Sequence, residues 1–509
     1  MSEEIKEEVV ATEEPVAAQA EVQPKNWFDK FFGVTKSGST FRIEIVAGLT
    51  TFMAMVYILM VNAGMFANVI GGEDPYGAAY IATAIGAIVG TLLMAFLAKM
   101  PLAQASGMGI NAFIVYTLVL GGTGLSYANC MVFTLLDGAI FLLLTVTGLR
   151  KKIFEAIPAG VRHAIPVGIG LFIAFIGMQN AKIIVGNPST LVDFASFNLL
   201  ADTPFVTYDV AAGVGGMLPA IIAIFGVIAI AILSKKKVKG AILWGILGSA
   251  VVYYIALAIA LACGNEAAAA IFDSISLSNP FSAFAAWGKD SAGAVFTEGF
   301  NFNTYLAVEG NTVGSLIILL LTTALSLCMI DMFDTIGTLY GACSKGNLLD
   351  EKGAPLNMEK MMLADAIATC TGAIAGTSTV TTFVESASGV TAGGKTGLTA
   401  LVTGVLFFVA MFLSPVAQLI PSCATATALI WVGVLMMGSV TKIDWEDGAD
   451  AIVAFLTFII MVLGYSISTG IGMGIIAYVI VKVCTGKIKE ISIPTWVIAI
   501  IFVATFLLT

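Results

Sequence analysis

The sequence predicts an all-α polytopic membrane protein, and three observations carry this prediction. Of the 509 residues, 58% are hydrophobic and only 11% are charged, whereas a soluble domain carries about 25% charged residues. Apolar stretches of about 20 residues, the length that crosses a bilayer, follow one another from residue 43 to the end of the chain. Two further stretches at membrane depth are rich in glycine, serine and threonine.

We expect about 14 transmembrane helices, each from one apolar stretch. Their predicted ranges are 43–66, 77–98, 102–121, 127–148, 160–178, 217–234, 239–262, 313–340, 363–376, 378–394, 397–420, 426–440, 449–466 and 468–483. A further apolar stretch at 491–508 is left open, because it could span, re-enter or lie flat.

The basic residues give an independent orientation, because lysine and arginine accumulate in cytoplasmic loops. With an internal N-terminus and alternating spans, all but Lys182 and Lys289 of the 24 basic residues fall on the cytoplasmic side. The long connections 179–216 and 263–312 then lie outside as loops. Residues 1–40 are predicted to be a disordered, acidic cytoplasmic tail. The expected location is the cell membrane of a bacterium.

Two segments interrupt the helical pattern, in the third span at 101–113 and in the tenth at 377–397. Backbone without helical hydrogen bonds is tolerated at membrane depth only when it faces protein or a watery cavity. The third of the first seven spans corresponds to the third of the second seven, which indicates two inverted 7-helix repeats with broken helices at the binding site. The alternative is that these small residues only allow close helix packing.

Four acids lie inside apolar runs, where an aspartate costs about 2.5 to 3.5 kcal/mol. These residues are Asp137, Asp331, Asp334 and Glu385. No basic residue lies deep enough in a span to neutralise Asp334 or Glu385, so we expect these two to bind ligand and exchange protons. Asp137 and Asp331 are equally compatible with helix packing, and Thr335 is expected to help hydrate the face of Asp334.

Long motifs resemble the AzgA-like purine nucleobase permeases of the nucleobase–ascorbate transporter superfamily. They are FRIEIVAGLTTFMAMVYILMVNAGMF (41–66), GMGINAF (107–113), FDTIGTL (333–339) and GTSTVTTFVESASGVTAGGKTGLTA (376–400). The resemblance runs from about residue 40 to the end. Position 105 is alanine, where the family usually has a proline nearby.

The resemblance implies a core domain and a gate domain. The core would comprise 41–152 (spans 1–4) and 311–422 (spans 8–11), and the gate 153–310 (spans 5–7 with external loops) and 423–509 (spans 12–14). It also implies that Asp334 and Glu385 contact the substrate and couple to protons, with the half-helices of spans 3 and 10 pointing at it.

A purine base suits the residues of these motifs. Its N–H groups need acceptors, which Asp334 and Glu385 supply. Backbone amides near Gly109, Asn111 and Ser386 could hold its carbonyl oxygens, and Phe383 could stack on its flat face. A permanent anion would need fixed positive charge, and these motifs offer only helix N-termini.

The predicted function is therefore proton-coupled uptake of adenine, guanine or hypoxanthine, with the bilayer and the nucleobase as partners and the proton as coupling ion. No cofactor, metal, nucleic acid or enzymatic activity is expected. A uracil or xanthine permease is the main alternative, and a channel or an intramembrane aspartyl hydrolase are distant ones. The oligomeric state is open, a homodimer included.

Overall fold

The computed structural model describes residues 27–148, 157–197, 204–209, 213–275, 279–351 and 354–508. Residues 1–26, the greater part of the predicted tail, lie outside the described residues, as do residues 149–156, which include three of the basic residues predicted to be cytoplasmic. Residues 27–40, predicted as the end of the tail, are instead folded. They contain helix α1 (Trp27–Phe32), whose Phe31 and Phe32 rings lie 6.2 and 6.0 Å from the ring of Phe96.

The first half of the chain contains the helices of the first predicted repeat and two hairpins. In order they are α2 (Phe41–Met55), α3 (Tyr57–Phe66), α4 (Pro75–Leu93), the π-helix η1 (Met94–Ala98), β1 (Gln104–Ser106), α5 (Met108–Ala112), the π-helix η2 (Phe113–Val119), α6 (Tyr127–Val146), α8 (Ala159–Asn180), β2 (Ile184–Asn187), β3 (Leu191–Phe194), β4 (Thr207–Asp209), β5 (Gly213–Gly215), α9 (Met217–Lys235) and α10 (Ala241–Ala262).

The second half begins with short helices and then follows the same plan. These elements are α11 (Glu266–Ser274), α12 (Pro280–Asp290), α13 (Ala294–Thr297), α14 (Asn303–Leu306), α15 (Val313–Lys345), α16 (Met358–Ala375), β6 (Val380–Thr382), α17 (Ser386–Thr391), α18 (Gly397–Ala410), η3 (Met411–Leu413), α19 (Ser414–Gln418), α20 (Ser422–Met436), η4 (Met437–Lys442), α21 (Gly448–Leu463), α22 (Ile467–Cys484), η5 (Ile488–Glu490) and α23 (Ile493–Leu508).

Ten helices among the described residues are long and apolar enough to cross a membrane, and each coincides with one of the fourteen predicted spans. The other four predicted spans, the third, ninth, tenth and thirteenth, are shorter or more polar. The ninth is α16, which carries Glu359, Lys360 and Asp365. The thirteenth is α21, with 16 residues. The apolar stretch left open at the C-terminus forms α23, which packs against α22 and α15.

The third and tenth spans are broken, as predicted, but each break is a β-strand rather than irregular backbone. Strands β1 and β6 pair antiparallel, with Ala105 opposite Thr381. Because the two strands hydrogen-bond to each other, their backbone groups are satisfied at membrane depth without a helix. The prediction of an all-α protein therefore holds for the spans, while this pair and two hairpins add short strands.

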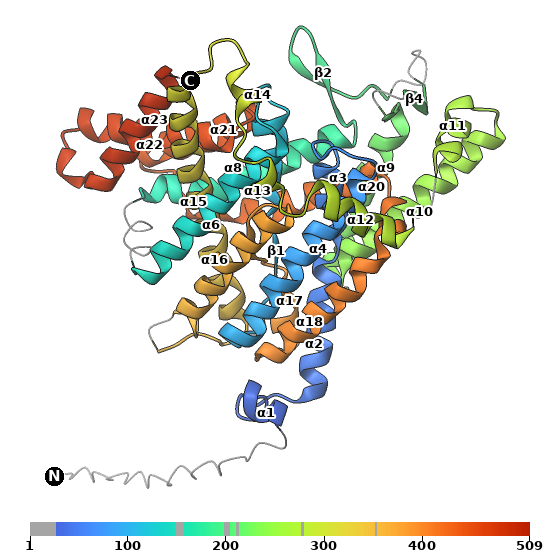
Figure 1. The fold of residues 1–509 in the computed structure, drawn as a ribbon, viewed down its shortest axis with the longest axis horizontal. Coiled ribbons are helices and arrows are strands. Elements are labelled where there is room, and N and C mark those ends of the chain that lie inside the picture. Colours follow the sequence, from blue (N-terminus) through green and yellow to red (C-terminus); the bar gives the residue numbers. More distant parts are fainter. Residues whose placement is uncertain are drawn as a thin grey trace, which may run out of the picture.

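The predicted external loops also contain regular structure. The connection 179–216 carries the hairpins β2–β3 and β4–β5, and the connection 263–312 carries α11 to α14. Helix α1 and the hairpin β2–β3 lie at opposite ends of the molecule (Figure 1). This separation agrees with the predicted placement of the chain start and the long loops on opposite sides of the membrane.

The packing of the helices is similar in the two halves of the chain. Helix α4 packs on β1 and α18, and its counterpart α16 packs on β6 and α6. Helix α8 packs on α20 and α21, and its counterpart α20 packs on α8 and α9. Such reciprocal contacts are expected of two inverted repeats that share one pseudo-twofold axis.

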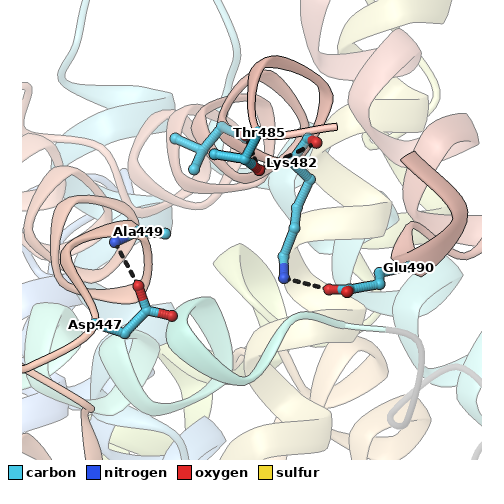
Figure 2. Close-up of polar contacts among 6 residues, drawn as sticks. Asp447, Ala449, Lys482, Thr485 and Glu490 are labelled. Atoms are coloured by element: carbon cyan, nitrogen blue, oxygen red, sulfur yellow. Dashed lines mark hydrogen bonds and ion pairs between the residues drawn. The ribbon is translucent and has the colours of Figure 1, made fainter. Parts of the chain in front are cut away.

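Charged groups fix helix ends in the C-terminal part of the chain (Figure 2). Asp447 caps α21 by accepting the amide of Ala449 at 2.9 Å. Lys482 of α22 reaches Glu490 of η5 at 2.5 Å, across the turn that leads into α23. The Glu490 end of this ion pair is exposed, so solvent and salt screen the attraction between the two charges.

A buried carboxylate joins the first membrane helix to a helix of the second repeat. Glu44 of α2 is fully buried and accepts the amides of Lys395 and Thr396 at 3.1 and 3.3 Å and the hydroxyl of Thr399 at 2.5 Å. These donors lie at the start of α18, where an acidic group also interacts favourably with the helix dipole. Glu44 therefore holds α2 against α18.

We predict that Glu44→Ala lowers the free energy of unfolding by roughly 1–3 kcal/mol, because it leaves buried donors without an acceptor. Thermal denaturation of the purified protein in detergent measures this change. The control is Glu73→Ala, which removes an exposed carboxylate. Equal stability of the two variants would contradict the role assigned to Glu44.

Candidate functional site

The centre of the candidate site is the β1–β6 pair and the two short helices that follow it. The amide of Gly107 donates to Thr379 at 2.9 Å, and that of Phe383 donates to Ala103 at 3.1 Å, which extends the pairing beyond both strands. Small residues let the two short helices pack closely on α8 and α2. A Cβ on Gly109 would come within 2.6 Å of Ile169, and one on Gly389 within 2.0 Å of Thr51.

A cavity of about 1200 Å³ lies beside this crossing. Residues of α2, α5, α8, α15, α17 and α20 line it, together with the turn between α9 and α10. Asp334 of α15 and Glu385 at the start of α17 both line this cavity. The two acids predicted from the sequence are therefore brought to one cavity from two different helices of the second repeat.

The wall of the cavity near the acids is apolar and aromatic. Phe383, Pro166, Ile169 and Trp431 line it, and they come from β6, α8 and α20 and their connections. A concave apolar surface with a few polar groups is typical of a small-molecule site. The arrangement can hold a flat ligand and accept hydrogen bonds from its edge.

Tyr57 fixes the position of Glu385. The Tyr57 side chain is fully buried, and its hydroxyl donates to Glu385 Oε1 at 2.7 Å. The amides of Ser386, Ala387 and Ser388 donate to carbonyls within the same turn, at 3.1, 3.0 and 2.9 Å. These amides, which the sequence offered as donors to a ligand, therefore already have partners.

The seven predicted binding residues divide into two groups. Asp334, Glu385, Gly109 and Phe383 line the cavity. The other three are buried behind it in hydrogen bonds: Thr335 donates to Asp365 at 2.7 Å, Ser386 accepts the amide of Ala103 at 3.0 Å, and Asn111 accepts the hydroxyl of Ser106 at 2.9 Å. Within this structure these three side chains support the wall rather than form it.

Asp365 is a buried acid that the sequence analysis did not single out. It accepts hydrogen bonds from Gln104 of β1 at 3.0 Å and from Thr335 at 2.7 Å. Thr335 follows Asp334 in α15, so this carboxylate joins the strand crossing to the helix of a cavity acid. The sequence could have indicated Asp365, because it lies within the apolar and small-residue segment LADAIATC. An acid in such a segment is energetically unfavourable in a membrane, as argued above for Asp334.

A second buried polar cluster lies around Ser106, at the other end of β1 from Gln104. The Asn62 amide donates to Thr83 at 2.6 Å and Thr377 at 3.1 Å, and Thr377 donates to Ser106 at 2.9 Å. Ser106 and Ser378 both contact Asn111. These side chains bind the strand pair to α3 and α4.

The remaining two embedded acids have a different place. Asp137 of α6 and Asp331 of α15 are fully buried, and neither belongs to the wall of the cavity.

The sequence analysis did not single out Tyr57, because an aromatic residue in a membrane span usually serves only in packing.

The sequence matches known transporters over nearly all of its length. The profile described as the Permease family covers residues 42–473. The chain is 36% identical to the guanine/hypoxanthine permease PbuO of Bacillus subtilis, over 92% of this chain and 98% of that protein. It is 34% identical to the adenine permease AdeP of Escherichia coli, over 93% and 95%. A putative permease of Methanocaldococcus jannaschii is 37% identical, over 94% and 98%.

Solved structures support the fold. The transmembrane domain of the cyanobacterial bicarbonate transporter BicA aligns with a TM-score of 0.56 at 14% identity, over 85% of this chain and 97% of that one. Murine Slc26a9, an anion transporter in the inward-facing state, aligns with a TM-score of 0.56 at 12% identity, over 93% and 74%. The extent of the sequence match, together with this shared fold, establishes that the chain belongs to the Permease family.

Proposed function

We propose that this protein takes up purine nucleobases across the cell membrane in symport with protons. The observation that carries the proposal is the meeting of Asp334 and Glu385 in one apolar and aromatic cavity. A base would donate its N–H groups to the two carboxylates and lie against Phe383 and Trp431. The names of PbuO and AdeP, as guanine/hypoxanthine and adenine permeases, support purines as the substrate class.

The proposal of proton coupling rests on the free-energy cost of burying ionised Asp334 and Glu385. When the base has been released, the carboxylates are left without its hydrogen bonds in a largely apolar cavity. The ionised form of a carboxylate is unfavourable there. Taking up a proton from the outside before the base binds removes that cost. Asp334 or Glu385 would therefore carry the proton inward with the base.

The proposed moving parts are a core of 41–152 and 311–422 and a gate of 153–310 and 423–509. Helices α2 to α6 pack mainly with α15 to α18, and α8 to α10 pack with α20 to α22. The cavity lies between these groups, since α15 and α17 line it with α8 and α20. Movement of the core against the gate would expose the acids to each side in turn.

The test of substrate class is accumulation of labelled hypoxanthine, adenine, guanine, xanthine and uracil in cells that lack their own permeases. We expect saturable uptake of a purine that a protonophore abolishes. Xanthine or uracil as the preferred base would select the alternative permease. No accumulation of any base, with the protein present in the membrane, would contradict the proposal.

Glu385→Ala should abolish this uptake without preventing membrane insertion. One hydrogen bond to a charged group contributes about 1.5–3 kcal/mol, so its loss lowers affinity by roughly 10- to 150-fold. Tyr57→Phe should have a smaller effect than Glu385→Ala and only raise the KM for the base, because the carboxylate of Glu385 remains and loses only the hydroxyl that positions it. The matched control is Tyr76→Phe. Tyr76 lies at the start of α4, outside the cavity wall, and its hydroxyl donates to the Ala417 carbonyl. Wild-type uptake by the Glu385→Ala variant would rule out this assignment.

Asp334→Asn should uncouple uptake from the proton gradient, because an amide keeps a similar shape but cannot exchange a proton. We expect internal base to reach only the external concentration, with no response to external pH or to a protonophore. Initial rates measured between pH 5 and 8 test this. Wild-type accumulation and pH dependence in this variant would assign the coupling elsewhere.

A further inference from the structure

The cavity is lined by acidic residues in its interior and by basic residues at its opening. The acids Asp334 and Glu385 lie beside the strand crossing, and four lysines also belong to the cavity wall: Lys237, Lys239, Lys345 and Lys442. All four lysines are exposed, which places them at the mouth of the cavity. We call them the mouth lysines.

A continuous wall joins the acids to the mouth lysines. On α15, Gly337 and Thr338 line the cavity between Asp334 and Lys345, and the helical rise places these two ends about 16 Å apart along the axis. On α17, Ser388 and Thr391 continue the wall from Glu385. A ligand could therefore contact both levels while lying along one surface.

The mouth lysines come from three elements that meet at the opening. Lys345 ends α15, Lys442 ends η4, and Lys237 and Lys239 lie in the turn between α9 and α10. That turn is held in place: the amide of Lys237 donates to Ser234 at 2.9 Å, and a Cβ on Gly240 would lie 3.1 Å from Met53 of α2. The backbone of the turn is thus fixed against the neighbouring helix.

A neutral base does not use this positive charge. The acids and the aromatic residues satisfy a purine at the inner level, and the cavity of about 1200 Å³ exceeds the range of about 300–1,000 Å³ typical of small-molecule pockets. The additional space and the lysines suit a larger ligand that bears the same base and an anionic group. Lysines bind phosphate as point charges, and a phosphate monoester carries about −1.5 to −2 at pH 7.

We propose that the cavity binds purine nucleoside monophosphates from the side of the mouth lysines, with the base at Asp334 and Glu385 and the phosphate at the lysines. This inference rests on the proposed function, because it places the same base at the same acids. By the excess of basic residues on that side, the mouth faces the cytoplasm. The nucleotide made from an imported base would then occupy the base site and slow further uptake.

The experiment is competition binding on the purified full-length protein in detergent. A labelled purine base is displaced with its nucleoside 5′-monophosphate, its nucleoside or ribose 5-phosphate. We expect the nucleotide to displace the base at least tenfold better than the nucleoside, and to do so less well as salt increases, because exposed charges are screened. Ribose 5-phosphate should not displace it.

Lysine variants test the phosphate contact. Lys345→Gln with Lys442→Gln should raise the half-inhibitory concentration of the nucleotide at least tenfold, while the affinity for the base stays within twofold. The matched control is Lys235→Gln with Lys236→Gln, which removes two charges beside the same opening from side chains outside the cavity wall. Equal displacement by nucleotide and nucleoside, or an unchanged nucleotide response in the first variant, would overturn the inference.

Calorimetric titration of the nucleotide without base separates the two proposals. Base binding without nucleotide binding would overturn this inference and leave the proposed function standing. Lysine-dependent nucleotide binding by a protein that binds no base would retain the phosphate site and contradict the proposed function. Ribose 5-phosphate that binds as tightly as the nucleotide would overturn the role of the base.

Discussion

The pairing of β1 with β6 is the constraint on which the rest of the structure depends. A chain that leaves helical conformation inside a bilayer must satisfy its backbone groups within the protein. Here two segments separated by more than half of the sequence, Gln104–Ser106 and Val380–Thr382, satisfy each other. Because the strands belong to opposite repeats, this one pairing fixes both repeats around a common centre and places both short helices beside the cavity.

Two buried polar clusters lie at the two ends of β1, and they differ in charge. At the Ser106 end, Asn62, Thr377 and Ser106 form a neutral chain of amide and hydroxyl groups. At the Gln104 end, the carboxylate of Asp365 accepts hydrogen bonds from Gln104 and Thr335. The acidic cluster supports α15, the helix that carries Asp334. The carboxylate therefore lies on the side of the helix that carries Asp334, one of the two acids that we propose exchange the proton.

Much of the fold was predictable because it follows from solvation. The cost of exposing polar backbone to lipid gives apolar stretches of characteristic length, and the cost of a buried charge singled out Asp334 and Glu385. The strand pair was not predictable in this way, because Ala105 and Thr381 meet only through the tertiary fold. Likewise, the hydrogen bond between Tyr57 and Glu385 joins residues that are far apart in the sequence. The folded start of the described chain was also not predictable, because its Phe31 ring packs near Phe96 of a different element.

The central claim is that base and proton meet at Asp334 and Glu385, and the most direct test is proton entry into proteoliposomes that contain the purified protein and an internal pH dye. On addition of the transported purine outside, our account predicts internal acidification that begins with the base, saturates with its concentration and is absent in the Asp334→Asn and Glu385→Ala variants. Entry of labelled base at the wild-type rate without any acidification would contradict it.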